Sequence, residues 1–181
     1  SNYELYYGNP SAGSPPADGS NVYLFYDDFS TNTLGSYSWS GSSMMSRTYD
    51  ATNQRVRFYG REQGQLSPTA SQNWVDVAVQ MRVMINLRSQ EGSGGNWANI
   101  MMPGGRSTGT FYSGVTGGIF EHEQYTPPSR AQIWDDSGEK TNVAFNYTVG
   151  QWYKVSINMY DSTAWLYIDD VFKTSSSAIT P

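Results

Sequence analysis

Residues 75–85 read Val-Asp-Val-Ala-Val-Gln-Met-Arg-Val-Met-Ile. Every second side chain in this stretch is apolar, from Val75 to Ile85. Successive side chains of a β-strand point to opposite faces of its sheet, so this alternation predicts a strand with one buried face. We expect the strand to cover residues 75–87, with its odd-numbered residues in the core.

Similar runs follow along the chain, rich in β-branched and aromatic residues and separated by clusters of Gly, Pro, Asn, Asp and Ser that favour turns. No stretch has the 3.6-residue periodicity of an amphipathic helix. Many short strands with turns between them are typical of an all-β sandwich or barrel. The Gly-rich segments 87–96 and 103–109 are expected to be loops at its rim. The predicted strands are residues 22–29, 37–40, 44–49, 55–60, 75–87, 98–102, 110–119, 131–134, 143–147, 152–160, 164–168 and 171–173.

The most definite local prediction is a tight hairpin near the C-terminus. Trp165–Ile168 and Val171–Lys173 flank the pair Asp169-Asp170. A two-residue loop with positive φ joins antiparallel strands most readily, and Asp tolerates positive φ less well than Gly does.

A chain of 181 residues suits a single all-β domain. Tyr3–Tyr7 reads as a short strand, and the segment from Gly8 to Ser20 is rich in Pro, Gly and Ser. We therefore divide the chain into an N-terminal strand and linker, residues 1–20, and one domain, residues 21–181. No signal peptide is present, so the chain is expected to be a fragment or a processed product.

The composition excludes several classes of function. The formal net charge is −5 and the 11 basic residues are scattered, so nucleic acid is not an expected partner. No apolar run reaches the roughly 18 residues of a membrane span. Cysteine is absent, which excludes disulfides, thiolate metal sites and a cysteine nucleophile. Many hydroxyl and amide side chains, few lysines and an Asn-Tyr-Thr sequon at Asn146 indicate an extracellular or cell-surface location.

Three motifs carry a resemblance to a known superfamily. Tyr26–Phe29 opens the domain, and Gly150–Val155 followed by Ala164–Asp170 closes it. This pattern resembles the concanavalin A-like superfamily of lectins, laminin-G-like domains and glucanases, with Asp170 at a position where the pattern usually has Gly. The resemblance implies a two-sheet antiparallel jelly-roll sandwich. The segment Leu5–Ala12 resembles the tail of an uncharacterised β-domain that precedes such modules in bacterial and archaeal surface proteins.

The aromatic content suggests a ligand. Six Trp and 14 Tyr exceed what one core of this size requires, and sugars stack their C–H faces on aromatic rings while polar side chains bind their hydroxyls. Trp152 and Phe172 are expected in the core because of their places in alternating strands. Core packing or chance exposure remains an equal alternative for each predicted ring. The resemblance puts Trp97, Tyr112, Tyr125 and Trp134 on the middle strands of a concave sheet. The predicted ligand-binding residues are these four together with Arg82, Glu121 and Glu123.

Catalysis is the less favoured interpretation of these acids. The laminarinase-type glycosidases of the superfamily carry Glu-x-Asp-x-x-Glu, which supplies a nucleophile and an acid about 5 Å apart. Here Glu121-His122-Glu123 lacks the third acid, and a solvated strand end explains it more simply. Polysaccharide lyases of similar fold use a Gln-x-His element that this chain lacks.

Calcium is the one cofactor that the sequence suggests. Calcium takes six to eight oxygen ligands, and three Asp-Asp pairs occur in the chain. Asp27, Asp28, Asp169 and Asp170 are the candidate ligands, since the first and last strands of lectin-like sandwiches lie near each other. Ordinary turns, in which Asp caps its own backbone, explain the pairs equally well, including Asp135-Asp136.

These observations predict a non-catalytic carbohydrate-binding or adhesive module of a secreted or surface protein, whose partner is a polysaccharide or other glycan. The first alternative is a structural subunit of an extracellular filament or layer. In that case Tyr3–Tyr7 would pair with copies of the chain or with neighbouring domains of the parent protein. The second alternative is a glycoside hydrolase or polysaccharide lyase.

Overall fold

The computed structural model describes residues 24–41, 43, 45–60, 64–69, 76–86, 99–101, 103–105, 114–121 and 129–180. Over these residues the chain is built of antiparallel strands with one turn of 3-10 helix, η2 (Leu34–Ser36), which confirms the all-β prediction. None of their helices has the length and apolar character of a membrane span. The strands are β1 (Tyr37–Gly41), β2 (Met45–Asp50), β3 (Arg55–Gly60), β4 (Gly64–Pro68), β5 (Val77–Met84), β6 (Asn99–Met101), β7 (Gly104–Gly105), β8 (Val115–Glu121), β9 (Ser129–Asp135), β10 (Gly138–Ala144), β11 (Trp152–Tyr160), β12 (Thr163–Ile168) and β13 (Val171–Ser176).

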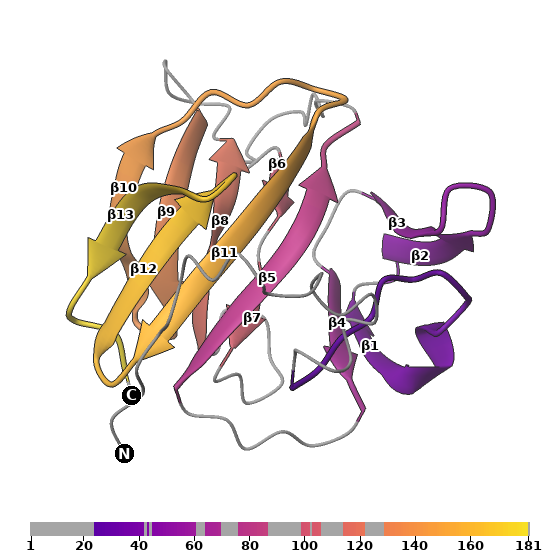
Figure 1. Cartoon of the computed structure of the whole chain (residues 1–181), viewed down its shortest axis with the longest axis horizontal. Coiled ribbons are helices and arrows are strands. Elements are labelled where there is room, and N and C mark those ends of the chain that lie inside the picture. The colour runs from indigo at the N-terminus through magenta and orange to yellow at the C-terminus, as the bar shows by residue number, and fades with distance from the viewer. Residues whose placement is uncertain are drawn as a thin grey trace, which may run out of the picture.

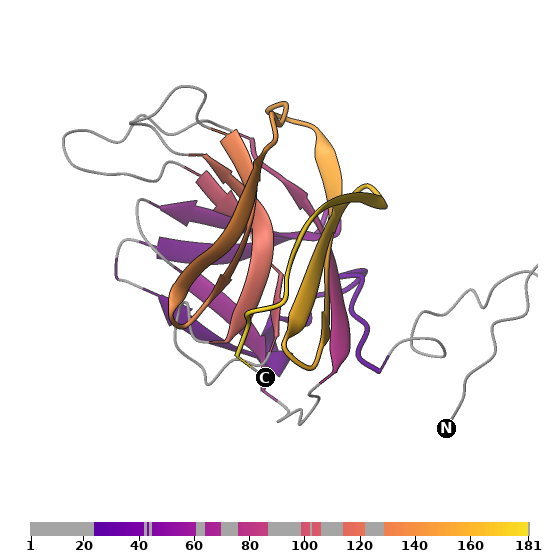
Figure 2. The ribbon, with the colours of Figure 1, turned by 90° about the vertical axis from the view of Figure 1, so that its left-hand side faces the viewer.

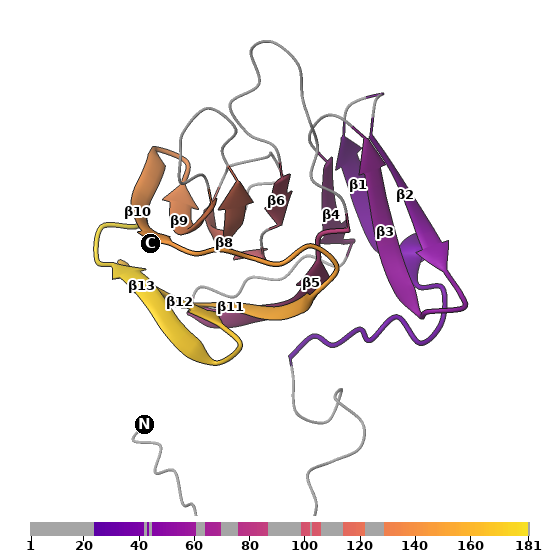
Figure 3. The same ribbon diagram turned by 90° about the horizontal axis from the view of Figure 1, so that it is seen from above.

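Two sheets pack face to face and form a β-sandwich (Figure 1). The five-stranded sheet has the order β10-β9-β8-β6, with β7 also paired to β8. The four-stranded sheet has the order β13-β12-β11-β5. Strands β8 and β11 are in contact across the interface, as are β9 and β12. Figures 2 and 3 show the two sheets as separate layers.

The core lies between these sheets and is made by alternate residues of their strands. Ile119, Ile133, Ile157 and Leu166 are completely buried there. On β5 the odd-numbered residues from Val77 to Val83 all face this core, as the alternation predicts. A Cβ at Gly117 would come within 2.8 Å of the Cδ1 atom of Ile157, so the two layers approach closely at β8 and β11.

The predicted C-terminal hairpin is confirmed. Ile168 pairs with Val171, and the two loop residues Asp169 and Asp170 have φ values of 51° and 62°. Positive φ at both central residues is the feature of a type I′ turn, whose twist matches that of the strands it joins. The Asp169 carboxylate accepts a hydrogen bond from the backbone N–H of Lys154 at 2.8 Å, which fixes the turn to β11.

Two smaller sheets, β1-β4 and β2-β3, stand on the β5 side of the sandwich (Figure 1). Trp39 of β1 stacks on Phe58 of β3 with ring centroids 5.8 Å apart, so aromatic packing joins the two sheets. The Arg47 guanidinium also packs on this aromatic pair, 5.0 Å from the centroid of the Trp39 ring.

The predicted strand over residues 22–29 is wrong for its described part, because residues 24–29 form no strand. The Asp27 carboxylate accepts hydrogen bonds from the Phe29 backbone N–H at 2.8 Å, the Thr33 hydroxyl at 2.6 Å and the Tyr37 hydroxyl at 2.7 Å. Phe29 itself has a φ of 53°. A side chain that gathers nearby donors offers the backbone an alternative to strand pairing, and here that alternative forms.

The sequence pattern did not predict β4 or β7, and it predicted the start of β10 too far along the chain. β4 is Gly-Gln-Leu-Ser-Pro, and β7 consists of two glycines in a segment that was expected to be a loop. β10 begins at Gly138 instead of residue 143 and ends at Ala144, because its polar first half pairs with β9 all the same. Residues 145–147, predicted as the end of that strand, lie outside it.

The expectation that Trp152 and Phe172 are core residues is also wrong. Trp152 is 41% exposed and Phe172 is 53% exposed. On β11 the core positions are the odd-numbered ones from Tyr153 to Met159, so Trp152 has the outward parity. Phe172 instead meets the outward ring of Tyr167 edge-on, with centroids 5.8 Å apart.

Candidate functional site

The outer surface of the four-stranded sheet carries aromatic and polar side chains around β11, one of its two inner strands, and we call it the β11 face. β11 lies between β5 and β12, and its even-numbered residues point away from the core. Tyr160 at the end of this strand is 66% exposed. Strand pairing arranges the outward side chains in three rows: Ala78, Asn158 and Trp165; Gln80, Ser156 and Tyr167; and Arg82 with Lys154.

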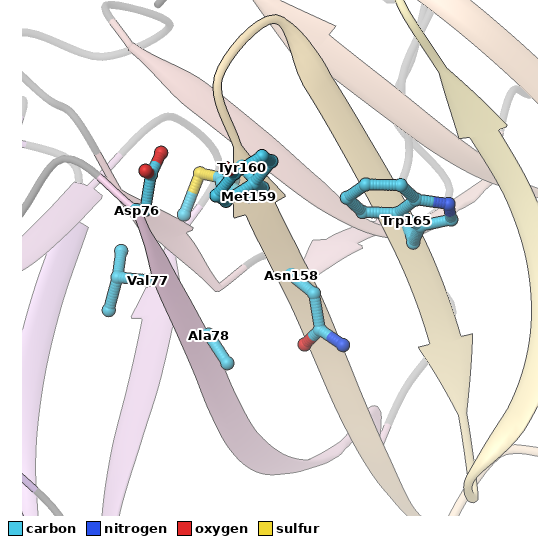
Figure 4. Close-up of a pocket in the computed structure, with 7 residues that line it drawn as sticks. All are labelled: Asp76, Val77, Ala78, Asn158, Met159, Tyr160 and Trp165. Carbon is cyan, nitrogen blue, oxygen red and sulfur yellow. The ribbon is translucent and has the colours of Figure 1, made fainter. Parts of the chain in front are cut away.

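A pocket of about 300 Å³ lies at one end of the β11 face (Figure 4). The Asn158 side chain lies between Ala78 of β5 and Trp165 of β12, its cross-strand neighbours. The small Ala78 side chain leaves room beside the amide. The lining is formed by Asp76, Val77, Ala78, Asn158, Met159, Tyr160 and Trp165.

The polar groups of the pocket differ in how they are engaged. Asp76 Oδ1 accepts a hydrogen bond from the Asp161 backbone N–H at 2.8 Å, which ties the start of β5 to the turn between β11 and β12. Within the described part of the chain, the Asn158 amide and the Trp165 indole N–H make no hydrogen bond. An amide has two donor hydrogens and an acceptor oxygen, so Asn158 is equipped to bind a hydroxyl.

A cationic group lies at the opposite end of the β11 face. The Arg82 guanidinium is 5.8 Å from the centroid of the Trp152 ring and forms no ion pair with another described residue. The neighbouring Lys154 Nζ donates to the Asp170 carboxylate, and the two side chains are 31% and 75% exposed. An ion pair exposed to this degree contributes little stability, about 0–1 kcal/mol.

This arrangement suits a ligand with apolar ring faces and hydroxyl groups. The exposed Tyr160 and the half-buried Trp165 offer aromatic faces for stacking, and aromatic side chains supply much contact area at small entropic cost. Asn158 between them supplies donors and an acceptor.

Arg82 and Trp134, two residues predicted to bind one ligand, lie on opposite outer faces of the sandwich. Trp134 stands on β9, half-buried, and its indole N–H donates to Gln132 Oε1 at 3.0 Å. Gln132 is 1% exposed and its Nε2 donates to Glu139 at 2.6 Å. Trp134 is therefore held in a polar network of its own, and one compact ligand cannot bridge it to Arg82.

The other predicted ligand contacts are not described in detail by the structure. Glu121 is the last residue of β8, where its backbone pairs with Ser129, and its side chain is outside the description. Trp97, Tyr112, Glu123 and Tyr125 lie outside the described residues. Their role in ligand binding stays a prediction, as does the pairing of the two glutamates.

The four predicted calcium ligands fall in two separate parts of the fold. Asp27 and Asp28 precede β1, and each caps a turn, Asp28 by accepting from the Ser30 N–H at 2.9 Å. That hydrogen bond lowers the pKa of Asp28 below its ordinary value. Asp169 and Asp170 form the β12–β13 turn, and no group of three acidic or histidine residues able to hold a metal occurs in the described ranges. Calcium binding stays a prediction.

Asp27 and the groups that donate to it, namely the Phe29 N–H, Thr33 and Tyr37, form what we call the Asp27 cluster, and Tyr37 is closely packed in it. Burial, together with the hydrogen bond to the Asp27 carboxylate, raises the pKa of the Tyr37 phenol well above its ordinary value. The phenol therefore stays protonated and donates to Asp27 over the whole physiological range. The cluster is a structural one that holds the chain at its entry to β1.

Sequence reasoning missed Asn158, Tyr160 and Trp165 as ligand-binding candidates. The sequence did contain evidence for them. All three occupy outward positions in strands whose inward positions are all apolar. A buried strand of a sandwich needs only polar residues at its outward positions, so a Trp or Tyr there is informative.

One family model, described as "Domain of unknown function (DUF2341)", matches residues 1–42 of this chain. The matched segment ends after β1 and includes the Asp27 cluster. It agrees with the resemblance of the N-terminal segment to an uncharacterised domain and leaves the sandwich itself unmatched. The searches of curated proteins and of solved structures returned no match.

Proposed function

We propose that this chain is a non-catalytic carbohydrate-binding or adhesive module of a secreted or cell-surface protein, with a concanavalin A-like jelly-roll fold, and that the β11 face is its ligand site. One observation carries the proposal. In the row Ala78, Asn158 and Trp165, an amide that has no hydrogen-bond partner among the described residues lies between a small residue and an aromatic ring at an open pocket. An unengaged amide beside a ring matches what a pyranose presents, namely apolar C–H faces edged by hydroxyls.

The β11 face also suits a chain of sugar units. Aromatic rings stand in consecutive rows across β11 and β12. Tyr160 faces Thr163 in a row beyond the pocket residue Asn158, and Trp165 and Tyr167 stand in the next two rows. Outward residues of one strand are two positions apart, so neighbouring rows are separated by about 7 Å. Stacking positions at this interval support a linear glycan better than a single small ligand.

Support for the jelly-roll assignment comes from the two facing antiparallel sheets and from the motif Gly150–Val155 followed by a type I′ hairpin. In this proposal the departure from the superfamily pattern at Asp170 is tolerated because Asp adopts positive φ more readily than most residues. The affinity expected of so open a site is modest, because little of the ligand surface is enclosed.

The test is binding of the full chain to immobilised polysaccharides and to a glycan array, with Trp165→Ala and Asn158→Ala as the informative variants. Trp165→Ala removes the stacking platform and should weaken binding by about tenfold or more. Tyr59→Ala is the matched control, since Tyr59 is 41% exposed on β3, in a different sheet. Circular dichroism and thermal melting establish that each variant is folded.

Trp134→Ala separates the two outer faces of the sandwich. If it abolishes binding while Trp165→Ala does not, the site lies on the five-stranded sheet. Failure of the wild-type chain to bind any glycan would refute the proposed function. Parallel assays in calcium and in EDTA test the calcium prediction, and an assay for newly released reducing ends tests for glycosidase activity.

A further inference from the structure

We infer that the ligand of the β11 face is an anionic glycan, whose carboxylate or sulfate group binds Arg82 while a sugar ring stacks on Trp165. This inference rests on the proposed function and adds the chemical class of the ligand. It is carried by the position of Arg82 on the same outward face as the pocket, and by the absence of an ion pair for its guanidinium among the described residues.

The geometry of Arg82 suits recognition of an oxyanion. Its guanidinium lies 5.8 Å from the centroid of the Trp152 ring, which is itself exposed on the face. Stacking on a ring restrains the guanidinium and leaves its N–H groups available at the edge. The planar fork of an arginine then matches two oxygens of a carboxylate or sulfate.

A second cationic side chain, Lys154, lies beside Arg82 and can also contact an anion. Lys154 is the cross-strand neighbour of Arg82, and its Nζ donates to the Asp170 carboxylate, which is 75% exposed. An ammonium group has three donor hydrogens, so Lys154 has capacity for a further acceptor. The exposed ion pair with Asp170 contributes little stability, and an incoming anion competes with it at small cost.

The spacing between the two ends of the face fits a glycan of more than one unit. Asn158 and Lys154 are four residues apart on β11, which corresponds to about 13 Å along a strand. Between them, Ser156 and Gln80 of the middle row lie within 3.4 Å of each other, Oγ to Oε1, and Gln80 is exposed. A ring on Trp165 and an acidic group on Arg82 therefore belong to different sugar units of one chain.

The net charge of the whole molecule means that any preference for polyanions must arise at the site itself. The formal net charge is −5, so polyanions are not attracted to the chain in general. Preference for an anionic glycan must then come from the local pair Arg82 and Lys154. Binding through these groups should weaken as sodium chloride is added, because exposed charges are screened over about 10 Å at 0.1 M salt.

The experiment compares three immobilised polysaccharides: dextran, dextran sulfate and polygalacturonate. The wild-type chain should bind one or both polyanions more tightly than neutral dextran, and which one it favours distinguishes sulfate from carboxylate. Arg82→Gln should weaken polyanion binding by about tenfold, the effect of losing one charge-assisted contact. Arg57→Gln is the matched control, since Arg57 stands 5.2 Å from the Tyr59 ring on β3, outside the sandwich sheets.

A gain of affinity gives a test that a folding defect cannot imitate. Asp170→Asn removes the carboxylate that engages Lys154 and keeps a residue that tolerates positive φ. We expect it to strengthen polyanion binding severalfold and to leave dextran binding unchanged.

The outcomes separate this inference from the proposed function. Equal binding of dextran and both polyanions, with no effect of Arg82→Gln, would overturn the anionic ligand and leave glycan binding standing. Loss of polyanion binding in Arg57→Gln to the same degree would also overturn it, because the attraction would then be diffuse. Failure to bind any of the three polymers, in agreement with an empty glycan array, would overturn both.

Discussion

Asp135 is a fully buried carboxylate at the end of β9 that ties three parts of the chain together. It accepts hydrogen bonds from the Ser137 N–H and hydroxyl, both at 2.8 Å, and from the Thr180 N–H at 3.2 Å. The Lys140 Nζ atom lies 3.2 Å from Asp135 Oδ2. The β9–β10 turn and the C-terminal tail are thus joined through one side chain, in a turn that the sequence already suggested.

Replacing this carboxylate should destabilise the fold. Asp135→Asn keeps the size of the side chain but leaves Lys140 without its anion and turns one acceptor into a donor. We expect the free energy of unfolding to fall by about 3 kcal/mol, as measured by urea denaturation. The exposed neighbour provides the control, since Asp136→Asn should change stability by less than about 0.5 kcal/mol. Equal losses in the two variants would contradict the role given to Asp135.

The contribution of Asp135 should also depend on pH. Burial raises the pKa of this carboxyl, but the hydrogen bonds from Ser137, Lys140 and Thr180 outweigh burial and leave the pKa below its ordinary value of 3.8. Because the folded-state pKa is the lower one, the stabilisation is complete above pH 3.8 and is lost as the pH falls through the folded-state pKa. Urea denaturation of wild type and Asp135→Asn at neutral pH and at pH values below 3.8 should show the difference between them shrinking in acid.

Individual residues of the candidate site were only partly predictable. Arg82 was predicted as a ligand contact and lies on the β11 face. Trp152 was assigned to the core because apolar residues in strands usually are, although its parity on β11 is outward. The partner of a side chain across the sheet depends on strand pairing, so the row that joins Asn158 to Trp165 could not be predicted without the fold.

At the scale of the strands, β8 and β11 meet where a glycine removes a side chain. An added Cβ at Gly117 would lie 2.8 Å from Ile157 Cδ1 and 3.1 Å from Leu166 Cδ1. These distances are shorter than normal carbon contacts, so a side chain at position 117 would force Ile157 and Leu166 to shift within the packed core.

A double-mutant cycle tests this contact between the sheets. Gly117→Ala should cost about 1–3 kcal/mol through overpacking, and Ile157→Val, which removes Cδ1, should cost about 1 kcal/mol. Since Ile157→Val removes the atom that the new methyl group meets, the double variant should be more stable than the sum of the two losses indicates. Additive losses measured by urea denaturation would show that the two positions are not in contact in solution.

The strands differ in how well local sequence specified them. β3 and β11 have the predicted limits because alternation and turn residues agree at both ends. β4 and the first half of β10 carry no apolar alternation, and they form strands because β1 and β9 offer backbone partners. Such strands are specified by tertiary pairing, which a single sequence read locally does not reveal.

At the scale of the whole molecule, the buried core of the described residues is assembled from residues between Val83 and Ile179. We therefore expect a chain that starts at Ser20 to keep the melting temperature and the glycan binding of the full chain. Differential scanning fluorimetry and the binding assay described above check this. A large loss of stability on truncation would show that residues 1–19 belong to the folded unit.

The same truncation decides between a module and a structural subunit. If the Tyr3–Tyr7 segment pairs with neighbouring chains, the full chain should form larger assemblies in size-exclusion chromatography and the truncated chain should be monomeric. Assembly of the truncated chain to the same extent would exclude this segment as the joint. The segment itself lies outside the described residues.

The alternation on β11 lets selection act on two properties separately. Odd-numbered residues from Tyr153 to Met159 hold the two layers together, and the even-numbered ones between them form the outer surface. If the β11 face binds a glycan as proposed, a display library randomised at residues 154, 156 and 158 would yield folded clones with altered sugar preference, whereas randomising 155 and 157 would mainly yield aggregates. Under the proposed function, ligand specificity can therefore change at the even-numbered positions with little change in thermal tolerance.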